Sequence, residues 1–367
     1  MASHGVPRVF QTRTESQRLQ DLAKIKRYQD LEAQIRTQAA SGTYDLQLFK
    51  LTDKLLSLNP EYYTIWNIRR HCLISSVLST IPDQRVSDAG EQITDVCRQN
   101  LDEDVLQSEL AFVMPLLKAA PKCYWIWKYR QWILMQTVLR LSVTVPRHEW
   151  EKELGLTSWL LSKDGRNLHA WSYRRFVVAK LESDELQGQS LVEDEFAYTK
   201  KKLFGLNLSN FSAWHNRSQL IPRLLRERHA DDETRAVFLK GELDIARQGL
   251  NVAADDQSLW YYHRFLISQI TNPVDSFAPA LTLADRIACL RYEIAELEDL
   301  LDDYDAVGLV YEDLLDYSLA LERLEKGKER ANVRNCLLSW LAKLRVLDPM
   351  HVGRWEDMES EIKQHLN

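Results

Sequence analysis

The sequence is poor in glycine, proline and cysteine. Only 12 Gly and 10 Pro occur in 367 residues, about half of the share that is usual in soluble proteins. This scarcity of helix breakers favours long helices. The cysteines are few, odd in number and far apart, which is typical of reduced thiols in the cytoplasm and not of a disulfide framework. We expect all five to be packing residues: Cys72, Cys97, Cys123, Cys289 and Cys336.

Long apolar runs and an excess of positive charge are also missing. The amino terminus has no apolar segment suited to a signal peptide, and no stretch is long enough to span a bilayer. The 47 Lys and Arg are outnumbered by 53 Asp and Glu, which gives a formal net charge of −6. This balance argues against a nucleic-acid partner, because phosphate binding needs a basic field over much of the surface.

The usual catalytic motifs are absent. The sequence contains no HExxH, CxxC, GxSxG, GxxxxGK[ST] or GxGxxG, so we expect neither a metal site nor a phosphate-binding loop within this chain. The acidic run from Glu296 to Asp305 is interpreted as a solvated helix face. Strand patterns are missing as well.

What the sequence does contain is an internal repeat. The segments LLSLNPEYYTIWNIRRHCL, LLKAAPKCYWIWKYRQWIL, LLSKDGRNLHAWSYRRFVV and LFGLNLSNFSAWHNRSQLI align without gaps, and each has Trp followed three residues later by Arg. The pairs are Trp66 and Arg69, Trp127 and Arg130, Trp171 and Arg174, and Trp214 and Arg217. A weaker fifth copy, LNVAADDQSLWYYHRFLI, fits if Tyr261 takes the Trp position and pairs with Arg264, which leaves Trp260 displaced by one.

Successive repeats are 61, 44, 43 and 47 residues apart, the first interval being enlarged by a longer connection near 79–90, which corresponds to one helical hairpin per unit. We therefore predict an all-α fold, a right-handed α-α superhelix (solenoid) of hairpins. Residues 1–13 are expected to be a flexible terminus, 14–43 a charged helix, 44–278 the repeats, and 279–367 three degenerate closing helices, with no domain boundary inside 44–367. Asn59 followed by Pro60 suggests a helix start, as do Asn167 and Asn210.

The repeated residues are interpreted first as scaffold. An i, i+3 spacing places each Trp and its Arg on one helix face. We expect the Trp rings in the core and the Arg side chains semi-buried, bonded to backbone or carboxylate groups of the next unit.

The starts of the Trp helices hold the candidate chemistry. Equivalent helix ends of stacked hairpins lie side by side, which would make Lys122 and Arg166 neighbours at an edge that already favours anions. A lysine there suits a phosphate or diphosphate. Tyr124 and His169 would point toward the same edge and donate hydrogen bonds.

Taken together, the repeats resemble the α subunits of the protein prenyltransferases, whose motif is a Pro- or Asn-marked turn, an aromatic residue, W-x-x-R and an apolar run. Five copies over residues 51–267 match. His4-Gly5-Val6, NPEYYTIWNIRR, RNLHAWSYRRFVV and LRVLDPM are most similar to the type II, Rab-specific branch. Some type II subunits also carry an immunoglobulin-like and a leucine-rich domain, and neither pattern occurs here.

The resemblance implies a crescent of paired helices around a separate β subunit, which carries the catalytic Zn²⁺, with none held by this chain. It implies an enzyme that acts as a heterodimer, moving geranylgeranyl from geranylgeranyl diphosphate to cysteines of Rab GTPases presented by an escort protein. Lys122 would reach the diphosphate with Tyr124 nearby, and Arg166, Asn167 and His169 would lie at the same edge. The Tyr that the family has between the last two is Leu168 here, so its hydroxyl is lost.

Some alternatives remain open from the sequence. His4 could reach toward the partner's zinc or belong to a disordered terminus. The chain could instead be the α subunit shared by farnesyltransferase and the type I enzyme, which act on CaaX proteins. It could also be a scaffold of TPR type without chemistry, although the 34-residue TPR pattern is not found.

Overall fold

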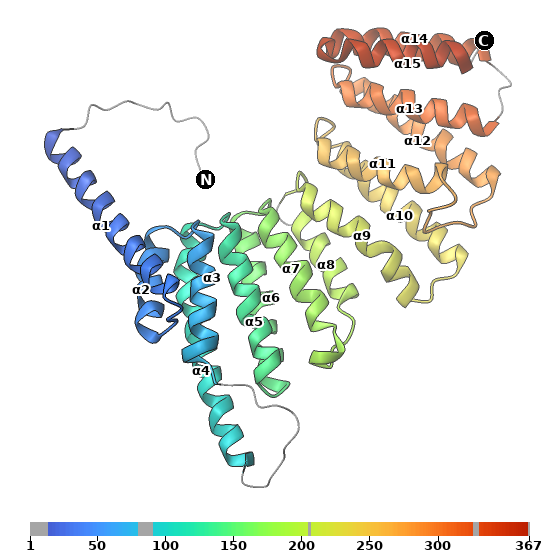
Figure 1. Cartoon of the computed structure of the whole chain (residues 1–367). Helices are drawn as coiled ribbons and strands as arrows, with labels where there is room; N and C mark the ends of the chain where they lie inside the picture. Colours follow the sequence, from blue (N-terminus) through green and yellow to red (C-terminus); the bar gives the residue numbers. More distant parts are fainter. Residues whose placement is uncertain (1–13, 80–90, 205–206, 326–329, 366–367) are drawn as a thin grey trace. The chain divides into compact units, whose positions relative to one another are not determined.

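The computed structural model describes residues 14–79, 91–204, 207–325 and 330–365. Over these residues the chain is all-α, with no strand, and the predicted solenoid of helical hairpins is confirmed (Figure 1). His4 lies outside the described residues.

The chain divides into two compact units. The first comprises Met1–Lys163 and Asn167–Gln189, and the second Asp164–Arg166 and Ser190–Asn367. Both units belong to one run of hairpins, so the absence of a domain boundary inside 44–367 stays a prediction. Stacked hairpins contact only their neighbours, and an array of this kind can divide at any junction without a mark in the repeat spacing.

The first unit contains three hairpins that follow a long leading helix. Helix α1 begins after Thr14, whose hydroxyl forms a capping box with Gln17, and it falls within the predicted 14–43 segment. Consecutive helices then pair as α2 with α3, α4 with α5 and α6 with α7. The helices are α1 (Glu15–Ala40), α2 (Leu46–Leu58), α3 (Tyr63–Cys72), α4 (Glu91–Ala119), α5 (Tyr124–Arg140), α6 (Thr144–Lys163) and α7 (Leu168–Leu181), with a π-turn at Leu73–Val77 and a 3-10 turn at Asp184–Leu186.

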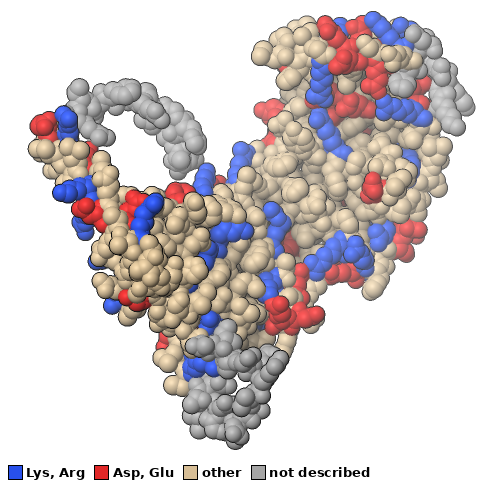
Figure 2. All heavy atoms as spheres, viewed as in Figure 1, with Lys and Arg blue, Asp and Glu red and all other residues tan. Residues whose placement is uncertain are grey.

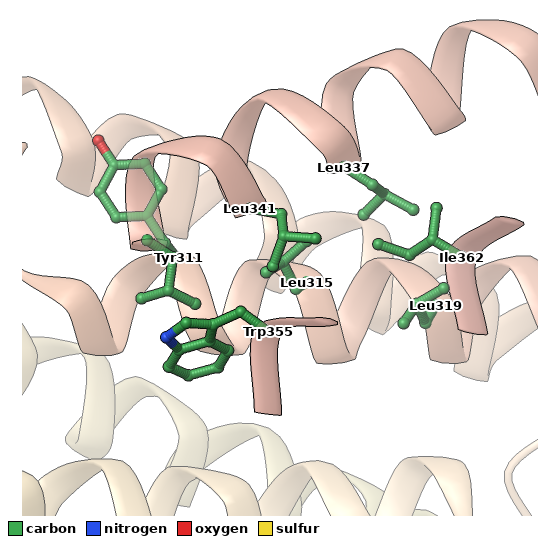
Figure 3. Packing of buried hydrophobic residues seen from close by; sticks show 8 residues of the cluster. Tyr311, Leu315, Leu319, Leu337, Leu341, Trp355 and Ile362 are labelled. Carbon is green, nitrogen blue, oxygen red and sulfur yellow. The ribbon is translucent and has the colours of Figure 1, made fainter. Parts of the chain in front are cut away.

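The second unit contains four hairpins. Its helices are α8 (Val192–Phe204), α9 (Phe211–Glu227), α10 (Asp232–Leu250), α11 (Gln257–Thr271), α12 (Leu283–Asp303), α13 (Gly308–Glu325), α14 (Arg330–Leu347) and α15 (Val352–His365), with a 3-10 turn at Pro349–His351. Four helices follow residue 279 where the sequence predicted three. The pattern of α15 is mostly polar, and its buried residues Trp355 and Ile362 pack in a cluster with α13 and α14 (Figure 3).

The repeated Trp fixes the turn that leads into its own helix. The indole N–H of Trp66 donates to the carbonyl of Pro60 at 2.8 Å, and that of Trp127 donates to Pro121 at 2.9 Å. Helix α3 begins at Tyr63, so the predicted cap at Asn59 is wrong. The Asn59 side chain accepts instead from the backbone N–H of Glu61 and forms a turn before the helix.

Candidate functional site

The W-x-x-R arginines form buried ion pairs between hairpins. Arg69 and Arg130 are 1% and 4% exposed, less than the semi-burial that was predicted. Arg69 makes two hydrogen bonds to Glu109 of α4, at 2.8 and 2.5 Å. The Tyr129 hydroxyl of α5 donates to the same carboxylate at 2.6 Å. One glutamate thus joins the helix before it to the helix after it.

The same arrangement recurs along each unit. Arg217 binds Glu242 at 2.7 and 2.6 Å, and the hydroxyl of Tyr262 donates to the same carboxylate. Burial and the neighbouring Glu242 carboxylate raise the pKa of Tyr262 well above its usual range, so that the phenol stays a donor. The Trp214 ring packs 4.5 Å from the Tyr262 ring, centroid to centroid. Trp, Arg, Glu and Tyr therefore form one structural unit that repeats.

In the fifth repeat the Trp position is held by Trp260 and not by Tyr261, which corrects the predicted alignment. Trp260 is fully buried and donates to the carbonyl of Ala254, six residues earlier, as Trp66, Trp127 and Trp214 do in their repeats. Tyr261 is 48% exposed. The motif of this repeat is W-x-x-H, since the residue three past Trp260 is His263.

His263 and Arg264 share the role that one arginine has elsewhere. His263 Nε2 lies 3.0 Å from Glu293 of α12 and Nδ1 lies 2.8 Å from the Tyr317 hydroxyl of α13. Arg264 binds Asp313 through Nε at 2.5 Å. Arg264 also forms an ion pair with Glu312 of α13 at 3.0 Å, so it bonds to carboxyl groups of the next hairpin, as predicted for the repeat arginines.

Two of the turns at the predicted diphosphate edge are tied together by Asn167. Its Oδ1 accepts from the N–H groups of His169 and Ala170 as the N-cap of α7, and its Nδ2 donates to the carbonyl of Pro121 at 3.2 Å. The side chain is buried. We predicted a substrate contact for Asn167, and its geometry shows that it positions the starts of α5 and α7.

The side chains that face outward at this edge are Lys122, Tyr124 and His169. Lys122 is exposed in the turn just before α5, and Tyr124 is the first residue of that helix. The rings of Tyr124 and His169 are in edge contact, with centroids 6.4 Å apart. Residues predicted from two repeats thus meet in the first unit.

A further cation, which was not predicted, lies at this edge. Lys128 lies one helical turn past Tyr124, and its Nζ is 5.4 Å from the centroid of the Tyr124 ring. An i, i+4 spacing on an exposed helix face was the available signal.

Arg166 is grouped with the second unit. Its Nη2 donates to the carbonyl and the hydroxyl of Ser209, at 2.7 and 2.5 Å, and its backbone N–H donates to Asp164. In that unit Arg166 fixes the turn that precedes α9.

An exposed apolar residue stands three positions before the repeat Trp in four repeats. These residues are Tyr63, Tyr124, Leu168 and Phe211, which are 53%, 46%, 71% and 47% exposed. In the first unit the Tyr63 ring also packs on Trp125, with centroids 5.2 Å apart. A monomeric protein rarely presents repeated apolar side chains of this size without a partner surface.

The five cysteines differ in their exposure. Cys72 and Cys123 are buried as predicted, whereas Cys97 and Cys336 are exposed, so the prediction that all five are packing residues is wrong.

Within the part of the chain that the structure describes, no group of three or more His, Cys, Asp or Glu could hold a metal ion. None of the described helices is long and apolar enough to cross a membrane.

Comparison with known families defines the class of protein. Residues 46–75, 106–137, 192–224 and 239–270 match the family described as protein prenyltransferase alpha subunit repeat. These segments coincide with the hairpins α2–α3, α4–α5, α8–α9 and α10–α11. The chain is thus a repeat protein of the prenyltransferase α-subunit class.

Relatives similar over the whole length identify the branch. The geranylgeranyl transferase type-2 subunit alpha of Candida albicans is 32% identical over 96% of each chain, and that of Saccharomyces cerevisiae is 31% identical over 99% of each chain. The protein belongs to the family of geranylgeranyl transferase type-2 alpha subunits, as the resemblance of segments such as RNLHAWSYRRFVV and LRVLDPM predicted.

A solved structure agrees in fold. A chain of the Candida albicans protein geranylgeranyltransferase-I complexed with GGPP superposes with a TM-score of 0.57 and 18% identity, covering 98% of this chain and 95% of that one. At this identity the agreement concerns the fold alone.

Proposed function

We propose that this chain is the α subunit of a cytoplasmic heterodimer that moves a geranylgeranyl group from geranylgeranyl diphosphate to C-terminal cysteines of Rab GTPases presented by an escort protein. The observation that carries the proposal is the similarity to type-2 alpha subunits over 96–99% of both chains. The alternatives, a shared α subunit acting on CaaX proteins and a TPR-like scaffold, are not favoured by these relatives.

The partner β subunit would supply the isoprenoid cavity and the zinc, which holds the substrate cysteine as a thiolate. The exposed apolar residue at the start of each Trp helix supports docking of that subunit. Tyr63 and Tyr124 in the first unit, and Phe211 in the second, project from the same position of their helices. Burying the exposed half of such a side chain against a partner stabilises the complex by about 1 kcal/mol.

The edge formed by Lys122, Tyr124 and His169 would meet the diphosphate. The reaction joins the cysteine sulfur to C1 of the isoprenoid and breaks the bond from C1 to oxygen, so negative charge grows on the departing diphosphate. The Lys122 ammonium would stabilise that charge, and the Tyr124 hydroxyl and a ring N–H of His169 would donate to phosphate oxygens. Asn167 would hold the two turns in register, because it bonds to both.

The test is geranylgeranyl transfer by the chain co-expressed with a type II β subunit. Transfer to a Rab–escort complex and to a CaaX-ended peptide is measured in parallel, for the wild type, Lys122→Ala and Lys152→Ala. Lys152 is the matched control, since it is an exposed lysine of the first unit that pairs with Glu149 on α6 at 2.7 Å. We expect transfer to Rab only, and a loss in kcat on the order of 10²-fold for Lys122→Ala alone.

Each other outcome has a distinct meaning. Transfer to the CaaX peptide only would move the chain to the shared-α class. Failure to form a complex or to transfer would leave a helical scaffold. If Lys122→Ala and the wild type have equal kcat, the chain is still a transferase subunit, but Lys122 does not contact the diphosphate.

A further inference from the structure

The C-terminal helices of the second unit form an apolar groove that the proposed reaction does not use. Helix α13 provides its floor, and α12 and α14 provide its walls, around a volume of about 200 Å³. The apolar lining residues are Ile294, Leu321, Val333, Cys336, Leu337 and Trp340. A cavity of this size accepts one large apolar side chain.

The groove is built on a packed core. Leu337 is fully buried in the cluster that Figure 3 shows, near Ile362, and it also lines the groove. Val333 and Trp340 are partly buried and pack against the same cluster. The wall formed by α14 is therefore fixed by the core beneath it and does not depend on a ligand for its position.

Carboxylates surround the apolar lining. Glu298 of α12 and Glu322 and Glu325 of α13 line the groove. Arg291 binds Glu325 at 2.8 Å. Among the described residues neither Glu298 nor Glu322 forms an ion pair. Partial burial and the neighbouring Asp299 raise the pKa of Glu298. Within the residues that the structure describes, no cation offsets that effect, so the two carboxylates have no positive partner there.

Past Glu298, the exposed charged residues of α12 are acidic. Asp299, Asp302 and Asp303 are exposed on the helix that carries Glu298. Figure 2 shows Asp and Glu gathered over the C-terminal helices on the visible face of this unit, next to basic side chains. Like charges on one helix repel each other, and a cationic partner relieves that repulsion.

We propose that this groove binds a basic segment of a partner protein, which inserts one large apolar side chain between α12 and α14 and places Lys or Arg beside Glu298 and Glu322. Charge complementarity selects the basic segment, and the apolar lining selects its anchor. An acidic or purely polar segment would leave the two carboxylates uncompensated. The proposal concerns the second unit only and does not depend on the transferase activity.

The test uses Cys336 as a reporter, because this thiol is exposed and lines the groove. Cys97 of α4 is also exposed and serves as the internal control. The full chain, co-expressed with its β subunit, is alkylated with iodoacetamide, and the rate at each cysteine is followed by mass spectrometry. The probe is a 12-residue peptide amide with a single Leu flanked on both sides by Lys at three- and four-residue spacing.

We expect the peptide to slow alkylation of Cys336 at least tenfold and to leave Cys97 unchanged. A peptide with Glu in place of Lys, and one with Ala in place of Leu, should not protect. Glu298→Gln combined with Glu322→Gln should weaken protection tenfold or more, while the matched change of exposed α15 carboxylates, Glu356→Gln with Asp357→Asn, should not. An unchanged rate at Cys336 without peptide shows that the variants are folded.

Three results would overturn the proposal. The first is no protection at about 1 mM peptide, the concentration that corresponds to about −4 kcal/mol of binding. The second is equal protection by the Glu-containing peptide. The third is unchanged protection in the variant that combines Glu298→Gln and Glu322→Gln.

Discussion

Arg130 of α5 and Glu153 of α6 form a doubly hydrogen-bonded ion pair inside the first unit, with Nε to Oε2 at 2.8 Å and Nη2 to Oε1 at 2.5 Å. The hydroxyl of Tyr173, on α7, donates to the same Oε2 at 2.7 Å. All three side chains are buried. The carboxylate thereby connects two successive hairpins, and burial together with that carboxylate raises the pKa of Tyr173.

Removing one member of this pair should destabilise the chain strongly. Arg130→Met leaves Glu153 charged, buried and without a cation, which costs about 3–5 kcal/mol. The double variant Arg130→Met, Glu153→Met removes both charges and should lose less than the single change. Urea unfolding followed by circular dichroism measures both. Losses that simply add would show that the two residues act independently.

The assignment of the fifth repeat gives a second prediction. Trp260→Ala should cost about 3–5 kcal/mol, because a fully buried ring and its bond to Ala254 are lost. Tyr261→Ala should change the free energy of unfolding by less than about 0.5 kcal/mol, since that side chain is half exposed. The same unfolding experiment compares them. A larger loss for Tyr261→Ala would restore the alignment that the sequence suggested.

The sequence predicted the parts of this fold that depend on local pattern. Trp66, Trp127 and Trp214 are buried where the repeats placed them, and Asn167 and Asn210 cap the helices that follow them. The partners of the repeat arginines could not be predicted in the same way. Glu109 lies 40 residues past Arg69, whereas Glu153 lies 23 past Arg130. No constant spacing marks these carboxylates among 53 acidic residues.

The fifth repeat shows why an alignment based on residue type alone assigns the wrong Trp position. W-x-x-R could be satisfied there only by shifting the pattern to Tyr261 and Arg264. In the structure Trp260 occupies the Trp position and His263 the Arg position, because burial of the larger ring fixes the register of α11. At the candidate site, Lys122 and Tyr124 could be predicted from one turn. The contact of Tyr124 with His169 required the packing of α5 against α7.

Asp313 should make stability depend on pH. Its burial raises the pKa of the carboxyl to about 8, from an ordinary value of 3.8, although Arg264 acts in the opposite direction. Between these values the folded chain keeps a proton that the unfolded chain releases, so the free energy of unfolding falls as pH rises from about 4 to 8. Asp313→Asn cannot ionise and should flatten this dependence. Thermal midpoints between pH 5 and 9 measure the difference, and parallel curves for the two proteins would contradict it.

Asn167 has two structural roles that two substitutions can separate. Asn167→Asp keeps an oxygen that caps α7 but replaces the Nδ2 donor to Pro121 with an acceptor, and it places two oxygens against each other. Asn167→Ala removes both the cap and the tie, and the cap alone is worth about 1 kcal/mol. If the tie holds Lys122 and His169 in register for the diphosphate, both variants should lower kcat, and Asn167→Asp should do so although its cap remains.

Asn210→Asp is the matched control, because Asn210 caps α9 and donates to Gly165 in the second unit in the same manner. The measurement is the kcat for geranylgeranyl transfer beside the thermal midpoint. An Asn167→Asp enzyme with the kcat of the Asn210→Asp control would show that the position of the α5 turn does not depend on this hydrogen bond.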